Sequence, residues 1–170
     1  LTYTGTGDMF TAVNPSLTIK DIEINAVSGT VFNTTGSTSG TVRLTNLNIP
    51  TVKNLGIIDS LRAFSVMNIT TSALTGDGFV YLGTDISLNI DSMVFSNVSA
   101  GVDLFKFGTA TFKKVNIGNV TVSDSAAGSV FLSGATSSSN IVVGSVANIT
   151  NVTIDGDMTS LVNIATTDNR

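Results

Sequence analysis

The chain has 170 residues, of which only 12% are charged; its formal net charge is −4, and it contains neither Cys nor His. The absence of Cys excludes disulfide bonds and thiol chemistry, and the absence of His excludes Ser-His-Asp catalysis and the common zinc sites. With a pI near 4.4 and eight Lys and Arg residues, the chain has no basic stripe, which argues against a nucleic-acid partner.

Hydrophobic residues make up 42% of the chain, but no apolar run approaches the roughly 18 residues that a membrane-spanning helix needs. We therefore expect no membrane insertion. The length suits one domain, so residues 1–170 are interpreted as a single domain. The chain starts at Leu1 without a charged and apolar leader, which indicates a fragment or processed product of a longer chain.

A phrase of four residues returns six times: an Asn (once an Asp), an aliphatic residue, a small polar residue and usually another aliphatic. Successive phrases start 22 to 32 residues apart. A period in this range is typical of a solenoid, in which each repeat buries its apolar face against the next. The phrases start at Asp21, Asn46, Asn68, Asn97, Asn119 and Asn151.

Short runs of alternating apolar and polar residues surround these phrases and indicate half-buried strands, as in Val42–Leu44 and Leu47–Ile49. Two polar residues repeatedly interrupt the alternation. In a flat strand this slip would turn the next apolar side chain to the wrong face. A bend at the interruption keeps both flanking apolar side chains inward, and Asn, Asp and Gly tolerate such a bend. The interruptions are Lys20-Asp21, Thr45-Asn46, Met67-Asn68, Lys113-Lys114, Gly118-Asn119 and Thr150-Asn151.

These patterns predict an all-β fold, a single-stranded right-handed parallel β-helix of about six coils. The alternative is an antiparallel β-sandwich, in which a bend has no reason to recur in every repeat. We expect the repeated Asn residues to form a side-chain amide ladder at the bend. A Gly followed by an aromatic or aliphatic strand recurs in most repeats and predicts an internal aromatic ladder. Its expected members are Phe10, Phe32, Tyr81, Phe105 and Phe131.

Paired carboxylates are the remaining route to catalysis, since glycan cleavage can use Asp and Glu alone. Asp21 lies two residues from Glu23, and Asp155 two residues from Asp157. We interpret both pairs as solvated turn residues, because no further acid completes a calcium loop and the chain has no Trp to stack on a sugar. The sequence therefore predicts no catalytic, cofactor-binding or metal-binding residues and no cofactor.

Asn-x-Ser/Thr sequons occur six times, and four of them coincide with the repeated phrase. We interpret those Asn residues as bend residues rather than glycosylation sites. Lys113-Lys114 also fits the bend pattern and is interpreted as a solvated edge rather than an anion site. The sequons start at Asn33, Asn68, Asn97, Asn119, Asn148 and Asn151.

The run from Gly78 to Arg170 carries several segments in a fixed order. They are Asp77–Thr84, Met93–Asn97, Gly108–Phe112, Ser133-Gly134 followed by Asn140-Ile141, and Ile164 followed by Asp168–Arg170. In the general character and the order of these segments, this run resembles bacteriophage virion proteins with right-handed β-helix segments. The resemblance implies a tail fibre, tail spike or head fibre, typically a homotrimer. It also implies a location on the extracellular particle surface, with other virion proteins and a host-surface glycan as partners.

The function favoured by this resemblance is a rigid structural module that contacts the host cell surface through variable loops, without enzymatic activity. Two alternatives remain open. One is a polysaccharide-degrading tail-spike domain, although the chain is short for a spike and lacks the acidic, aromatic-lined groove of the depolymerase type. The other is a bacterial surface adhesin or passenger domain with the same architecture.

Overall fold

The computed structural model describes residues 1–25, 27–108, 110–134 and 141–164, and its regular structure there is entirely β. Thr109, Asn140 and residues 168–170, which belong to the segments that carry the resemblance, lie outside these ranges. One set of strands comprises β1 (Phe10–Thr11), β3 (Val27–Asn33), β5 (Val52–Ile58), β7 (Phe79–Tyr81), β9 (Asp103–Lys106), β11 (Val130–Gly134) and β13 (Ser160–Ile164). The other set comprises β2 (Ser16–Glu23), β4 (Thr41–Ile49), β6 (Ala63–Thr71), β8 (Ile86–Ser96), β10 (Phe112–Ser125) and β12 (Ile141–Gly156).

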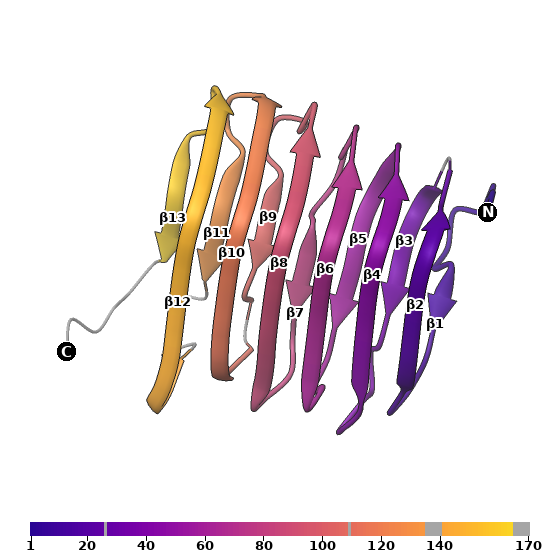
Figure 1. Cartoon of the computed structure of the whole chain (residues 1–170), viewed down its shortest axis with the longest axis vertical. Helices are drawn as coiled ribbons and strands as arrows, with labels where there is room; N and C mark the ends of the chain where they lie inside the picture. The colour runs from indigo at the N-terminus through magenta and orange to yellow at the C-terminus, as the bar shows by residue number, and fades with distance from the viewer. Residues whose placement is uncertain (26, 109, 135–140, 165–170) are drawn as a thin grey trace.

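Successive strands alternate between two stacked sheets, one of seven and one of six strands (Figure 1). All strand pairings between the described residues are parallel. The six even-numbered strands give five full turns between the first and the last, close to the predicted six coils. The parallel solenoid prediction is therefore confirmed, and the antiparallel sandwich alternative is wrong.

The hand of the coil can be followed in Figure 1. The even-numbered strands lie in front and run upward, the odd-numbered strands lie behind and run downward, and the chain advances from right to left. This path is a right-handed coil, the hand that the right-handed twist of strands favours for parallel crossovers.

The predicted bend is present within the even-numbered strands. In β4, Leu44 and Leu47 are both buried although Thr45 and Asn46 separate them, because Asn46 adopts a left-handed backbone with φ 53°. Asn and Asp adopt this conformation at low cost, since their short polar side chains can hydrogen-bond locally. Aligned bends stack coil upon coil, and their residues are Asp21, Asn46, Asn68, Ser92, Asn119 and Asn151.

The bend in β8 corrects the predicted series. The sheet register sets Ser92, with φ 58°, opposite Asn68 and Asn119. Asn97 also has a positive φ of 49°, but it directly follows β8, and the pairing of Ser96 with Ser123 places it beside Asp124 of the next coil. The sequence phrase around Asn97 is therefore real, but it marks a second corner.

The prediction of a bend at Lys113-Lys114 is wrong. Neither residue has a positive φ. The register of β10 against both neighbouring strands shifts between Phe112 and Lys114, so the extra residue is accommodated as a β-bulge.

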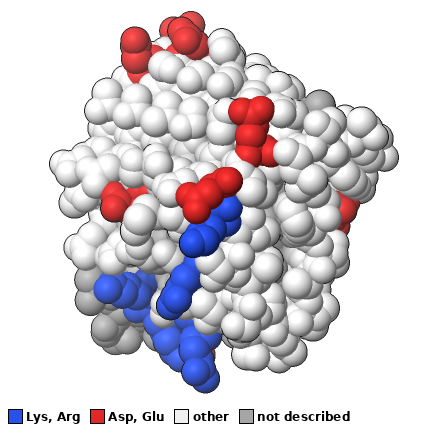
Figure 2. All heavy atoms as spheres, turned by 45° about the vertical axis from the view of Figure 1, so that its right-hand side comes forward, with Lys and Arg blue, Asp and Glu red and all other residues white. Residues whose placement is uncertain are grey.

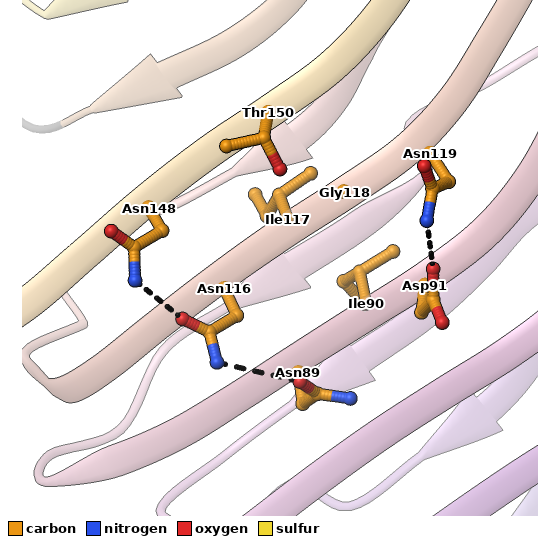
Figure 3. Close-up of a pocket in the computed structure, with 9 residues that line it drawn as sticks. All are labelled: Asn89, Ile90, Asp91, Asn116, Ile117, Gly118, Asn119, Asn148 and Thr150. Atoms are coloured by element: carbon orange, nitrogen blue, oxygen red, sulfur yellow. Dashed lines mark hydrogen bonds between the residues drawn. The ribbon is translucent and has the colours of Figure 1, made fainter.

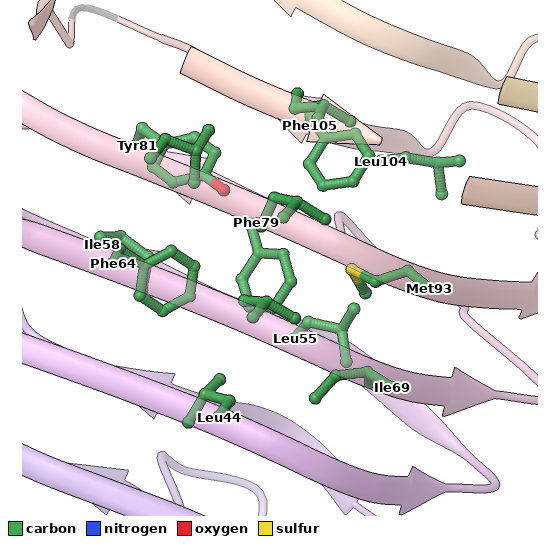
Figure 4. Packing of buried hydrophobic residues seen from close by; sticks show 14 of the residues in the cluster. Leu44, Leu55, Ile58, Phe64, Ile69, Phe79, Tyr81, Met93, Leu104 and Phe105 are labelled. Atoms are coloured by element: carbon green, nitrogen blue, oxygen red, sulfur yellow. The ribbon is translucent and has the colours of Figure 1, made fainter. Parts of the chain in front are cut away.

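The core runs continuously between the two sheets and is lined by Leu, Ile, Val and Phe (Figure 4). Burying one such side chain contributes about 1.5–3 kcal/mol. The aromatic ladder prediction holds only in part. Phe10 stacks on Phe32 with ring centroids 5.5 Å apart, and Phe105 contacts Phe131 at 5.2 Å. Tyr81 and Phe131 are out of register with this series, because Tyr81 lies opposite Ile58, and Leu132 rather than Phe131 lies opposite Phe105.

Phe79 takes the position expected for Tyr81, since it lies opposite Phe105 on one side and Gly56 on the other. Gly56 separates Phe79 from Phe32 in the register, which interrupts the ladder. A Cβ at Gly56 would lie 3.0 Å from the Phe79 ring and 3.3 Å from the Phe32 carbonyl. The missing side chain thus makes room for the Phe79 ring.

Candidate functional site

The outer face of the six-stranded sheet carries a row of side-chain amides over its last three coils. Asn148 donates through Nδ2 to Asn116 Oδ1 over 3.1 Å, and Asn116 donates to Asn89 Oδ1 over 3.5 Å (Figure 3). Their strands lie in register, so the three amides repeat at the strand spacing of about 4.8 Å. Each of the three residues lies three positions before the bend residue of its own strand.

A second polar row follows the bends and confirms the predicted amide ladder except at Asn97, whose amide donates to the Ser72 carbonyl instead. Asn46 donates to Asp21 Oδ1 over 2.7 Å and Asn68 donates to Asn46 Oδ1 over 2.9 Å. Further along the solenoid, Asn151 donates to Asn119 Oδ1 over 3.0 Å. In all three bonds the donor belongs to the later coil, so the ladder has one direction.

The ladder changes its partner where Ser92 occupies the bend. Asn119 there donates to the Asp91 carboxylate over 2.6 Å. A carboxylate accepts hydrogen bonds but cannot donate one. Asp91 therefore starts the second half of the ladder in the way that Asp21 starts the first half.

An open depression of about 420 Å³ lies between the two polar rows. Gly118 contributes only backbone to it, whereas the register neighbours Asp91 and Thr150 contribute side chains (Figure 3). Its other polar groups are the side-chain amides of Asn89, Asn116, Asn119 and Asn148, and Ile90 and Ile117 complete the lining. The depression thus offers amide donors and acceptors, one hydroxyl and one carboxylate.

Charge is sparse on the surface. Figure 2 shows a face that is mostly uncharged, with Lys and Arg gathered toward its lower end and carboxylates scattered elsewhere. Charged side chains therefore supply little of the chemistry that this face can offer to a partner.

The two predicted carboxylate pairs are not brought together. Asp21 and Glu23 lie on β2, and Asp155 lies on β12, at opposite ends of the six-stranded sheet. Asn25 and Asn48 donate amide hydrogen bonds to Glu23 and lower its pKa. A carboxylate held ionised in this way is a poor general acid.

Lys106 forms the densest ionic cluster of the described residues, on the seven-stranded sheet. Its Nζ lies 3.0 Å from Asp77 Oδ2 and 3.6 Å from Asp103 Oδ2, and Ser133 Oγ donates to Asp103 over 2.8 Å. The hydrogen bond to Asp77, aided by both carboxylate charges, raises the pKa of Lys106 although partial burial opposes the shift. A lysine that stays protonated cannot remove the Ser133 proton, so this cluster joins three coils without activating a nucleophile.

The sequon Asn residues use the same nitrogen that N-glycosylation would modify. Nδ2 of each donates a hydrogen bond to another coil, which supports a structural interpretation of these residues. The six bonds run from Asn33 to Asp8, Asn68 to Asn46, Asn97 to the Ser72 carbonyl, Asn119 to Asp91, Asn148 to Asn116 and Asn151 to Asn119.

Over the part of the chain that the structure describes, no three acidic side chains approach closely enough to hold a metal ion. In the same part, no helix is long and apolar enough to cross a membrane. Lys113 pairs with Asp85 over 3.5 Å, with both side chains largely exposed.

Comparison of the chain with protein-family models, curated proteins and solved structures finds no match in any of the three. The parallel solenoid itself is a fold compatible with a structural fibre or spike.

Sequence reasoning missed the row formed by Asn89, Asn116 and Asn148. A signal was present: the pattern Asn-Ile-x-Asn or Asn-Ile-x-Ser recurs at 89–92, 116–119 and 148–151. The depression at Gly118 could not be found in this way. Whether the space beside Gly118 is open depends on which residues of the neighbouring coils the register places next to it.

Proposed function

We propose that this chain is a rigid β-helical module of a bacteriophage fibre, exposed on the virion surface, and that it contacts the host cell. The observation that carries the proposal is the continuous parallel stack of coils, joined outside by directional amide ladders and inside by one apolar core. Each inner coil pairs its backbone with two neighbours, which supports a stiff rod that transmits force along its axis.

The composition of the outer face supports a contact role. An uncharged polar surface remains hydrated and soluble, yet it presents amides that can bind a partner through hydrogen bonds. The resemblance of the Gly78–Arg170 run to phage β-helix proteins adds the proposed partners, which are other virion proteins and a glycan of the host surface. It also adds the proposed homotrimer.

We favour this module over a polysaccharide-degrading spike. Catalysis by two carboxylates needs both groups to flank one glycosidic bond. Here the depression offers a single carboxylate, Asp91, and in the pair of Asp21 and Glu23 two amide hydrogen bonds keep Glu23 ionised.

Two measurements test the proposal. Light scattering coupled to gel filtration should give three times the 17.5 kDa mass of one chain. Fluorescently labelled protein should adsorb to cells of particular bacterial strains and not to others. A monomer would contradict the trimer, and failure to adsorb to any strain of a broad panel would contradict host contact.

A further inference from the structure

We propose that the depression over Gly118 binds the uncharged sugar rings of a glycan. They would lie between the amide row of Asn89, Asn116 and Asn148 and the Asn119–Asp91 pair. This inference rests on the proposed function and deepens it, because it names the ligand class and the residues that would recognise it.

Gly118 leaves an open space on the outer face of β10. Its φ is not positive, so its backbone does not require glycine. A Cβ there would meet Thr150 Oγ1 at 3.2 Å and no other atom closer than 3.8 Å, and the Thr150 hydroxyl can rotate away. A glycine inside a strand weakens it and often marks a place where a ligand approaches the backbone closely. The register neighbours Asp91 and Thr150 both carry side chains, so the empty space is particular to this coil.

The Asn116 amide is fixed by its neighbours and still has hydrogen-bonding groups to offer a ligand. Asn116 donates one N–H to Asn89 and accepts one bond from Asn148, which fixes the plane of its amide. A side-chain amide has two N–H groups and two lone pairs. Asn116 therefore keeps one donor and one acceptor outside the row. Groups already fixed by neighbours lose little conformational entropy when a ligand binds.

The charge of the depression favours a neutral ligand over an anionic one. Asp91 is the one ionisable side chain among the residues that line the depression. Its carboxylate repels uronate, sialate and phosphate groups and accepts hydrogen bonds from hydroxyls. Neighbouring hydroxyl groups of a neutral sugar both donate and accept, which matches paired amides. The lining contains no aromatic ring on which a sugar could stack, so we expect weak binding at each site.

The experiment measures sugar binding by saturation-transfer difference NMR. The neutral probes are maltotetraose, cellotetraose and chitotetraose, and the anionic probe is tetragalacturonate. Gly118→Gln fills the depression, and Asn116→Leu removes an amide without filling it. The matched control is Thr121→Gln, which adds a similar side chain to the exposed face of the same strand beyond the bend. Urea unfolding verifies that each variant is folded.

We expect at least one neutral probe to bind with a Kd on the order of millimolar, and both site variants to weaken it about tenfold or more. Thr121→Gln should change the Kd by less than about twofold. Tetragalacturonate should bind at least about tenfold more weakly than the best neutral probe. The inference is overturned if no neutral probe binds the wild-type chain, if Gly118→Gln binds as well as wild type, or if the anionic probe binds best.

Adsorption to bacterial cells distinguishes a failure of the proposed host contact from a failure of the proposed glycan site. If wild type and Gly118→Gln adsorb equally well to the same strain, host contact stands and the depression is not its site. If wild type adsorbs to no strain, host contact itself fails, and the NMR titration still decides whether the depression binds sugar.

Discussion

The Asn119 side chain donates to Asp91 over 2.6 Å, although the sheet register sets Ser92, and not Asp91, opposite Asn119. Asn46 and Asn119 each adopt the left-handed backbone and also receive the hydrogen bond from the next coil. In β8 these tasks are divided: Ser92 takes the bend with φ 58°, and Asp91 accepts the bond. The ladder therefore tolerates a change of residue at the bend when a neighbour supplies the acceptor.

The division of tasks predicts a difference between two substitutions of Asn119. Asn119→Ala loses the side-chain bonds to Asp91 and Asn151 and also places alanine at φ 53°. Asn119→Gly loses the same bonds, but glycine has no Cβ and adopts the left-handed backbone conformation without strain. A left-handed backbone costs a residue with a Cβ about 1–2 kcal/mol. Alanine should therefore destabilise the chain more than glycine by roughly 1 kcal/mol in urea unfolding. Equal loss in both variants would contradict the strained-bend account.

Tyr81 should be replaceable by phenylalanine with a gain in stability. Its hydroxyl is fully buried and has no hydrogen-bond partner among the described residues. A buried polar group without a partner costs about 1–3 kcal/mol. Tyr81→Phe should therefore raise the free energy of unfolding by about 1 kcal/mol. Tyr3→Phe is the control: Tyr3 is only partly buried and its hydroxyl donates one long, exposed hydrogen bond to the Asp8 carbonyl over 3.4 Å, so its effect should stay within about 0.5 kcal/mol. Destabilisation by Tyr81→Phe would refute this account.

The alkaline pH dependence of stability should depend on Lys106. The hydrogen bond to Asp77 raises its pKa above the ordinary 10.5. A raised folded-state pKa contributes stability that is fully present below the unfolded pKa and is lost as pH rises through the folded pKa. Wild type should therefore be more stable than Lys106→Met near neutral pH, by no more than about 1 kcal/mol because solvent screens the partly exposed pair.

The difference between wild type and Lys106→Met should shrink above pH 10.5. Burial raises the pKa of the Tyr81 hydroxyl well above its usual range, and Tyr81 is present in both proteins, so its contribution cancels in the comparison. Urea unfolding at a series of pH values gives the two curves. A difference that stays constant across the alkaline range would show that Lys106 acts through packing of its alkyl chain.

Gly56 on β5 and Gly118 on β10 should respond differently to substitution by alanine. At Gly56 the added Cβ meets the Phe79 ring at 3.0 Å in the core. Overpacking a core costs about 1–3 kcal/mol, and Gly56→Ala should destabilise the chain by that amount. Gly118→Ala meets only the rotatable Thr150 hydroxyl at 3.2 Å and should change stability by less than about 0.5 kcal/mol. Thermal unfolding compares the two variants. A larger loss for Gly118→Ala would mean that the outer face is more tightly packed than the core.

The sequence by itself determined the solenoid and the position of most bends. Local chemistry encodes both: at Thr45-Asn46 the bend keeps the two flanking buried leucines inward, whereas at Lys113-Lys114 a β-bulge accommodates the same pattern. The recurrence of that pair at near-equal intervals predicts stacking, since each coil must cover the apolar face of the next.

Only the tertiary structure decided which residues face one another between coils. Coils differ in length, so the register cannot be counted along the chain. It places Phe79 rather than Tyr81 beside Phe105, and Ser92 rather than Asn97 in the aligned bend. The depression at Gly118 has the same origin. A missing side chain makes a hollow only where the neighbouring coils bring side chains beside it, and hydrogen-bond register between strands far apart in sequence sets that arrangement.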